Sequence, residues 1–263
     1  MTQTHRYADL DRPEVLSVLF HPRPESPFLG GRGEALTIPV GEGEQIGGVL
    51  HSSGAQAPTL LFFHGNGEIV ADYQELAPQF TQRGINFLPV DYRGYGRSSG
   101  SPTVRAMMHD CHDILAFCRT TLQERGYTGP LLVMGRSLGS ASALELAAAY
   151  PGLISGLIIE SGFAYAAPLL RLMGVDMQAL GLSEETVFDQ LAKIEAYSGP
   201  TLIIHAEQDQ IIPFSEGQAL YGASGSQEKQ FLAIPQANHN DILFRDLPGY
   251  MQAVQDLAGK AKE

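Results

Sequence analysis

Cysteine is scarce in this sequence of 263 residues, which contains only Cys111 and Cys118. Both fall in a predicted helix, seven positions and therefore roughly 10 Å apart along its axis, which is too far for a disulfide. Without a disulfide framework, the default expectation is a protein of the reducing cytoplasm. A secretory signal peptide is not expected either, because the first residues are polar and no apolar core follows them.

Basic residues and long apolar runs are also few. The 17 Lys and Arg residues are outnumbered by 29 Asp and Glu, which gives a formal net charge of -12. So acidic a surface repels phosphate groups, and nucleic acid is therefore not an expected partner. No apolar run approaches the roughly 20 residues that a membrane-spanning helix needs, so stable membrane insertion is not expected.

Strand-like and helix-like segments alternate along most of the chain. Residues 1–34 are rich in Pro and Gly and predict an irregular N-terminal arm, whereas 36–40 and 45–50 predict a hairpin across Gly41 and Gly43. The apolar runs after it predict strands at 59–63, 85–92, 131–135, 153–160, 201–206 and 229–235. Helical stretches are predicted between and after them, at 72–83, 103–125, 137–149, 214–223 and 241–258.

This order predicts a single α/β domain over residues 35–263. Short, wholly apolar strands separated by helices are typical of a mostly parallel, doubly wound sheet, here with an antiparallel start. Ligands of such sheets bind beyond the carboxyl ends of the strands. Candidate functional residues are therefore sought directly after each apolar run.

A candidate nucleophile follows the predicted strand 131–135. Gly135-Arg136-Ser137-Leu138-Gly139 is a G-x-S-x-G motif between a strand and a small-residue helix, the context of a nucleophile elbow. The sharp turn strains the serine backbone and leaves no room for a Cβ at the flanking positions, which explains both glycines. The helix N-terminus also favours negative charge at the serine. The alternative is a serine that merely caps an ordinary helix.

A second G-x-S-x-G, Gly96–Gly100, lacks this context. Three residues separate it from its strand, and Pro102 follows it instead of a small-residue helix. We interpret this segment, with Ser98 at its centre, as a glycine-rich loop.

A serine hydroxyl needs an adjacent base to attack at neutral pH. Three histidines lie near the carboxyl ends of predicted strands, His64, His205 and His239, and we choose His239 as the base because it follows the last strand. Asp209 is the candidate acid, since the order Ser137, Asp209, His239 is the one expected of this fold. Glu207 and Asp241 remain alternatives, although Asp241 is in a position to cap the last helix.

Attack on a carbonyl creates an oxyanion that needs two preorganised N–H donors. We predict the backbone N–H of Leu138 as one donor and Asn66, in the loop His64-Gly65-Asn66-Gly67-Glu68, as the other. Gly65-x-Gly67 with Asp91 further on also imitates a dinucleotide fingerprint, but the third glycine position is Val70 and the partial motif is weak.

Together these motifs resemble the α/β-hydrolase superfamily from about residue 36 to the C-terminus. The matching segments are HGNGE (64–68), DYRGYGRSSG (91–100), GRSLGS (135–140), HAEQDQIIP (205–213) and NHND (238–241). DYRGYGRS and HGN are most similar to cofactor-free, single-domain esterases, thioesterases and lipases. The resemblance implies no cofactor, a triad of Ser137, Asp209 and His239, and oxyanion donors at Asn66 and Leu138. The sequence departs from it at Ala206, usually glycine, which touches no catalytic role. Haloalkane dehalogenases share HGN but use an aspartate nucleophile, so Ser137 argues against their chemistry.

The segment at about 162–198 stands where this superfamily often inserts a lid. Its first half is apolar and its second half, from Ser183, is amphipathic. Candidate residues for an acyl pocket are Phe163, Tyr165, Leu169, Leu170, Leu172 and Met173, although each could simply pack on the domain. A short lid suggests a small to medium acyl group. His109, Asp110, Cys111, His112 and Asp113 look like a metal cluster, but only i, i+4 pairs such as His109 and Asp113 can share an ion, and no metal is expected.

The sequence thus predicts a serine hydrolase that cleaves small-molecule carboxylic esters or thioesters through an acyl-enzyme on Ser137. Two alternatives remain: an acyl-transfer or peptide-bond-cleaving enzyme of the same fold, and a non-catalytic binding protein on a hydrolase scaffold.

Overall fold

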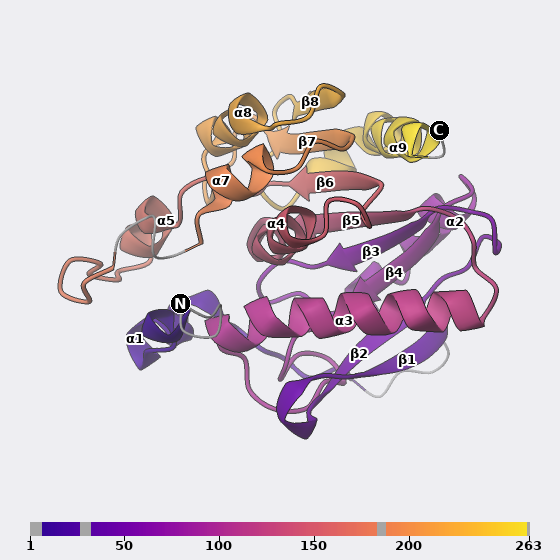
Figure 1. Ribbon diagram of the computed structural model, residues 1–263. Coiled ribbons are helices and arrows are strands. Elements are labelled where there is room, and N and C mark those ends of the chain that lie inside the picture. The colour runs from indigo at the N-terminus through magenta and orange to yellow at the C-terminus, as the bar shows by residue number, and fades with distance from the viewer. Residues whose placement is uncertain (1–6, 27–32, 183–187, 262–263) are drawn as a thin grey trace.

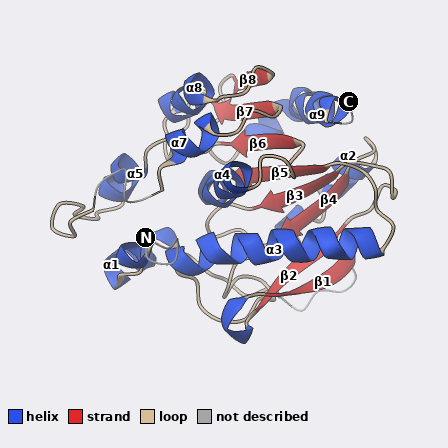
Figure 2. Ribbon diagram, in the orientation of Figure 1, coloured by secondary structure: helices blue, strands red, loops and turns tan. Residues whose placement is uncertain are grey.

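The fold centres on one eight-stranded sheet. The computed structural model describes residues 7–26, 33–182 and 188–261. The strand order is β1-β2-β4-β3-β5-β6-β7-β8, with β1 antiparallel to β2, β2 antiparallel to β4, and the remaining pairs parallel (Figures 1 and 2). The strands are β1 (Glu34–Pro39), β2 (Gln45–Leu50), β3 (Thr59–Phe63), β4 (Asn86–Val90), β5 (Leu131–Arg136), β6 (Gly156–Glu160), β7 (Thr201–Ala206) and β8 (Lys229–Ile234). The predicted α/β-hydrolase sheet with an antiparallel start is confirmed.

Helices cover both faces of the sheet, because alternate residues of each central strand are apolar on opposite sides. On one face Leu61, Val133 and Ile159 share a core with α3 (Val104–Glu124) and α4 (Ser140–Ala149), and α7 (Gln190–Glu195) packs against α4 and α8 (Phe214–Ala223). On the other face Leu60, Leu132 and Ile158 meet α2 (Ala77–Thr81) and α9 (Ile242–Lys260). No helix in the described part of the chain is long and apolar enough to cross a membrane.

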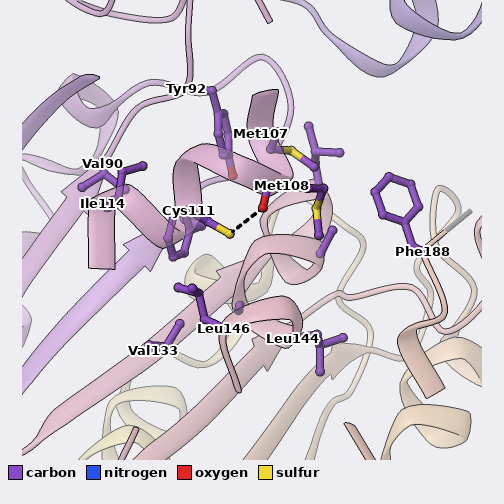
Figure 3. Close-up of a cluster of buried hydrophobic side chains, with 14 of the residues drawn as sticks. Val90, Tyr92, Met107, Met108, Cys111, Ile114, Val133, Leu144, Leu146 and Phe188 are labelled. Carbon is purple, nitrogen blue, oxygen red and sulfur yellow. Dashed lines mark hydrogen bonds between the residues drawn. The ribbon is translucent and has the colours of Figure 1, made fainter. Parts of the chain in front are cut away.

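The two cysteines belong to this core and form no disulfide. Cys111 lies on α3 among apolar side chains of α3 and α4, and its thiol donates to the carbonyl of Met108 at 3.3 Å (Figure 3). Burial raises the pKa of the Cys111 thiol well above its usual value and that of Cys118 to about 12. Both thiols therefore stay protonated and behave as small apolar groups.

Two predicted helices are interrupted, in each case near a proline. The stretch 72–83 is divided into a 3₁₀ turn at Val70–Tyr73 and α2, in whose first turn Pro78 lies. A proline ring clashes with the carbonyl four residues earlier, so one helix cannot continue through this point. The backbone of α9 is likewise non-helical at Asp246, two residues before Pro248.

The N-terminal arm is not irregular throughout, so that prediction is wrong for its middle part. Residues Pro13–Leu19 form α1, with Pro13 at the first helical position, where its fixed φ suits a helix and its missing N–H costs nothing. Val15 and Leu19 are buried in the α3 and α4 core. Beyond α1, the arm pairs with the loop after β4, where the Gly96 N–H donates to the Arg23 carbonyl at 2.9 Å.

A buried ion cluster ties this arm to α4 and to the 162–198 segment. Glu145 of α4 pairs with Lys193 of α7 at 2.8 Å and accepts a hydrogen bond from the Tyr7 hydroxyl at 3.0 Å. His112 of α3 lies 3.5 Å from its other oxygen. Burial by itself raises the pKa of Glu145, but the contacts with His112, Lys193 and Tyr7 outweigh it and lower the pKa to about 2. The carboxylate is therefore charged in the folded chain and stabilises it.

We predict that Glu145→Gln lowers the free energy of unfolding at pH 7 by on the order of 3 kcal/mol, because the buried charge pair between Glu145 and Lys193 is lost. The folded pKa of Glu145 lies below the usual 4.5. The contribution of Glu145 to the free energy of unfolding is therefore complete above about pH 4.5 and is lost as the pH falls to about 2. Urea unfolding of the wild type and the variant from pH 7 to pH 3 should show the difference shrinking. Glu195→Gln, an exposed substitution on α7, is the control. An equal loss at every pH would contradict this role.

Candidate active site

Ser137 occupies a strained turn at the end of the central strand β5. Its φ is 51°, in the left-handed region that residues with a side chain rarely adopt, and it begins a 3₁₀ turn that leads into α4. A Cβ at Gly135 would overlap the backbone of Gly139, and a Cβ at Gly139 would overlap the Phe63 carbonyl. Both glycines of the motif are thus required for α4 to approach the strands closely.

The structure brings together the three side chains that the sequence predicted as a catalytic triad. The Ser137 hydroxyl donates to His239 Nε2 across 3.0 Å, and His239 Nδ1–H donates to Asp209 Oδ2 across 2.7 Å. Each of the three residues is less than 10% exposed. Ser137 follows β5, Asp209 follows β7 and His239 follows β8, so the carboxyl ends of three parallel strands supply the chain of hydrogen bonds.

Asp209 is built to remain ionised. Its Oδ1 accepts the backbone N–H groups of Ile211 at 2.9 Å and Ile212 at 2.8 Å, while Oδ2 accepts from His239. Burial by itself raises the pKa of Asp209, but these donors outweigh it and the pKa lies below its usual value. A fixed carboxylate holds the imidazole proton on Nδ1 and leaves Nε2 as an acceptor facing the serine.

The rival histidines and acids do not contact Ser137. His64 Nδ1–H donates to the Gly65 carbonyl at 2.8 Å, and its Nε2 lies 3.3 Å from Asp91. His205 Nε2–H donates to the Ile212 carbonyl at 2.9 Å behind Asp209, and burial lowers its pKa. Glu207 is exposed.

Asp241 is also engaged elsewhere. It precedes α9, accepts the Asn238 N–H at 2.7 Å and pairs with Arg245 at 3.0 Å. The helix-start position predicted for Asp241 is observed, although its side chain accepts no hydrogen bond from the backbone N–H groups in the first turn of α9.

A pocket of about 280 Å³ opens over Ser137 and His239. Four of the predicted acyl-pocket residues line it, namely Phe163, Leu169, Leu170 and Met173, and three of these belong to or directly follow α5 (Ala166–Leu172). Tyr165 does not line it, and that prediction is wrong. Tyr165 has extended backbone angles before α5, is 40% exposed, and its N–H donates to Glu216. Leu172, also a predicted acyl-pocket residue, lies on the outer side of α5 and is 69% exposed.

The remaining lining residues were not among the predicted acyl-pocket residues. The walls are completed by Ala166 of α5 and, from other segments, by Leu19, His21, Glu68, Arg136, Phe188, Ile211, Ile212 and Asn240. Glu68, Arg136, Ile211, Ile212 and Asn240 stand inside the motifs quoted above, whereas Leu19, His21 and Phe188 belong to none of them. Part of the amphipathic stretch, residues 183–187, lies outside the described residues.

Both predicted oxyanion donors border the pocket. Leu138 is the second residue of the turn begun by Ser137, where backbone N–H groups have no partner inside a helix. The side chain of Asn66 is held by residues outside its own loop, because its Oδ1 accepts hydrogen bonds from the His21 N–H and the Tyr95 hydroxyl, each at 2.8 Å. Arg23 Nε–H donates to the Gly67 carbonyl at 2.7 Å. The N-terminal arm thereby fixes the loop after β3, a support that the sequence did not predict.

Ser98, Asp91 and Asp110, which belong to the motifs that we interpreted as coincidental, make hydrogen bonds that explain their positions. Ser98 accepts the Gly47 N–H at 2.9 Å in the glycine-rich loop, and Asp91 is buried and accepts the Val70 N–H at 2.9 Å. Both oxygens of Asp110 accept from Arg93, at 2.7 and 2.8 Å.

One group in the described part of the chain has the arrangement of a metal site. His109, Asp110 and Asp113 bring ligand atoms within 4.8 Å of one another, and His109 lies 3.7 Å from Asp113. Because the oxygens of Asp110 already accept from a buried guanidinium, the group is explained by its ion pairs.

Comparison with known proteins agrees with this architecture. The chain belongs to the α/β-hydrolase superfamily, and residues 54–184 match the family described as "Serine aminopeptidase, S33". It is 30% identical over 206 residues to Protein bem46 of Schizosaccharomyces pombe, covering 76% of this chain and 66% of that protein.

Solved structures with the same fold include esterases. An esterase of Pyrococcus furiosus superposes with a TM-score of 0.74 at 15% identity, over 91% of this chain and 98% of that one. Est1E of Butyrivibrio proteoclasticus, solved with ferulic acid, superposes with a TM-score of 0.68 at 19% identity, over 86% and 99%.

The geometry predicts that Ser137 reacts selectively with a fluorophosphonate probe, because its hydroxyl alone among the two motif serines faces an imidazole. Mass spectrometry of the labelled chain should place one adduct on the peptide that contains Ser137. Ser98→Ala should be labelled like the wild type, and Ser137→Ala should not be labelled. An adduct on Ser98, or none on either serine, would contradict this assignment.

Proposed function

We propose that the protein is a serine hydrolase of small-molecule carboxylic esters or thioesters. The observation that carries this proposal is the continuous hydrogen-bonded chain from Asp209 through His239 to Ser137 at the base of an apolar pocket. A binding protein has no need of a serine kept in a strained backbone conformation against an imidazole. The resemblance in fold to esterases adds support.

In the proposed reaction His239 acts first as a base and then as an acid. Ser137 Oγ attacks the acyl carbon while its proton passes to His239 Nε2, and Asp209 stabilises the imidazolium. The N–H groups of Leu138 and Asn66 would stabilise the oxyanion. His239 then protonates the leaving alcohol or thiol, and an acyl-enzyme remains on Ser137. Water, deprotonated by His239, attacks this ester and releases the acid.

The pocket supports an apolar acyl group of small to medium size. Leu169, Leu170 and Met173 line it together with Phe163 and Phe188, whose rings pack against each other edge to face. Its volume of about 280 Å³ lies just below the roughly 300–1,000 Å³ that is usual for small-molecule sites. The size of the described pocket therefore favours small to medium acyl groups over long ones.

Cleavage of a peptide next to a free N-terminus is a second candidate, because the matching family is described as a serine aminopeptidase. Recognition of an α-ammonium group calls for an available carboxylate. Glu68 is the one carboxylate among the described residues that line the pocket, and it is already paired with Arg136. The lining therefore favours esters over peptides.

We further propose a cytoplasmic location, in keeping with two buried thiols that remain unpaired.

We expect Ser137→Ala to lower kcat for p-nitrophenyl butyrate by about 10⁴-fold or more, since the nucleophile is removed. Asp209→Asn should lower kcat by about 10³- to 10⁴-fold, because the amide cannot hold the imidazole proton on Nδ1. Both variants should keep the wild-type circular dichroism spectrum. Aminoacyl p-nitroanilides assayed in parallel test the peptide-bond candidate. Full ester turnover by Ser137→Ala would refute the proposed mechanism.

A second test compares two leucines of α5. Leu169→Trp should narrow the pocket and reduce kcat/KM for p-nitrophenyl octanoate about tenfold, with acetate much less affected. Leu172→Trp is the matched control, because Leu172 belongs to the same helix but points to solvent. Acyl-chain profiles of both variants and the wild type provide the measurement. Equal profiles for the two variants would exclude this pocket as the acyl site.

A further inference from the structure

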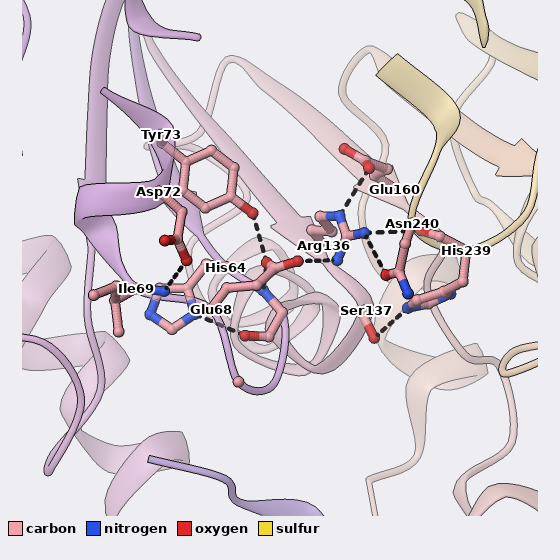
Figure 4. Close-up of polar contacts among 12 residues, drawn as sticks. His64, Glu68, Ile69, Asp72, Tyr73, Arg136, Ser137, Glu160, His239 and Asn240 are labelled. Carbon is pink, nitrogen blue, oxygen red and sulfur yellow. Dashed lines mark hydrogen bonds and ion pairs between the residues drawn. The ribbon is translucent and has the colours of Figure 1, made fainter. Parts of the chain in front are cut away.

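The residue directly before the nucleophile places a positive charge inside the protein. Arg136 is the last residue of β5 and is 9% exposed. Its guanidinium donates in three directions: from Nε to Glu160 at 3.0 Å, from Nη1 to Glu68, and from Nη2 to the His239 carbonyl at 2.8 Å (Figure 4). Nη2 also lies 3.3 Å from the side-chain oxygen of Asn240.

Each of these partners belongs to a different part of the site. Glu68 is in the loop of Asn66, where its Oε2 also accepts the Gly65 N–H at 2.6 Å and the Tyr73 hydroxyl at 2.5 Å. Glu160 ends β6 and accepts the Tyr250 hydroxyl of α9 at 2.7 Å. The third partner is the main chain of His239 itself. One rigid, planar group therefore connects the nucleophile turn, the oxyanion loop and the histidine loop.

Packing alone does not determine where this guanidinium lies. Glu68, Arg136 and Asn240 line the pocket above Ser137 and also a second cleft of about 270 Å³, which extends toward α2 and α9. These three side chains thus form a partition with space on both sides. Their positions depend on directional hydrogen bonds, which charged partners make stronger.

Stability is a poor explanation for such a group. A buried cation between carboxylates loses much of its hydration, and apolar residues of similar volume are often as stable. Burial acts to lower the pKa of Arg136, yet Glu160 and Glu68 outweigh it and raise the pKa further above its usual value. The guanidinium therefore stays charged at every pH at which the chain is folded.

From these contacts we propose that Arg136 is a positioning residue. It holds the main chain of His239 in place relative to Ser137. Through Glu68 it also holds the loop that contains Asn66. This inference rests on the proposed function but concerns its rate and not its substrate. Lysine keeps the charge but cannot donate in three fixed directions, so Arg136→Lys should misplace the imidazole while leaving the acyl pocket intact.

The test measures kcat and KM for p-nitrophenyl butyrate, the rate of fluorophosphonate labelling, and the melting temperature. Arg136→Lys should lower kcat and the labelling rate about 100-fold, as expected for a displacement of about 1 Å, with KM changed less than about threefold. Arg93→Lys is the matched control, because Arg93 is also buried and bidentate, with Asp110, but does not line the pocket. It should lower the melting temperature and leave kcat unchanged.

A second variant removes the network without leaving buried charges. Arg136→Met with Glu68→Gln and Glu160→Gln should melt near the wild-type temperature and still show the loss in kcat and labelling rate. If the folded Arg136 variants keep kcat and labelling within threefold of wild type, the inference is wrong. A wild type that is labelled but turns over no ester contradicts the proposed substrates, and labelling rates then decide the role of Arg136. A wild type that is neither labelled nor active overturns both proposals.

Discussion

The backbone turn at Ser137 is the constraint from which the rest of the site follows. A residue with a side chain is held at positive φ between a buried strand and a helix. This conformation costs of order 1–3 kcal/mol and persists only because the surroundings determine it. Glycines on both sides let α4 pack closely on the strands, and the strand ends then bring the other two side chains of the site to the serine.

Around this turn, hydrogen bonds hold both the side chain and the main chain of His239. Asp209 has backbone donors on one oxygen and His239 on the other, so its charge is fixed where the imidazole needs it. Arg136 performs the corresponding task for the main chain of the same histidine, because it donates to the His239 carbonyl. The side chains that α5 contributes to the pocket are apolar, which leaves the shape of that wall to select the acyl group.

The N-terminal arm is part of the same construction. Leu19 and His21 form part of the pocket wall, and the His21 N–H holds the side chain of Asn66. Tyr7 joins the ion pair of Glu145 with Lys193 and so connects the arm to α4 and α7. The segment between β6 and β7 is therefore anchored at α7, while α5 carries the pocket residues (Figure 1).

The sequence by itself determined the sheet, its order of elements and the three side chains after β5, β7 and β8, because strand periodicity and glycine spacing are local properties. The sequence placed the acyl pocket on α5, but the prediction was wrong at Tyr165, which has an extended backbone just before this helix and is 40% exposed. Only the tertiary structure decided the roles of His21, Glu68, Arg136 and Phe188. Their contacts join segments that are far apart in the sequence, such as Arg136 with His239 and Phe188 with Tyr7. No local sequence pattern specifies which distant segment a side chain will contact.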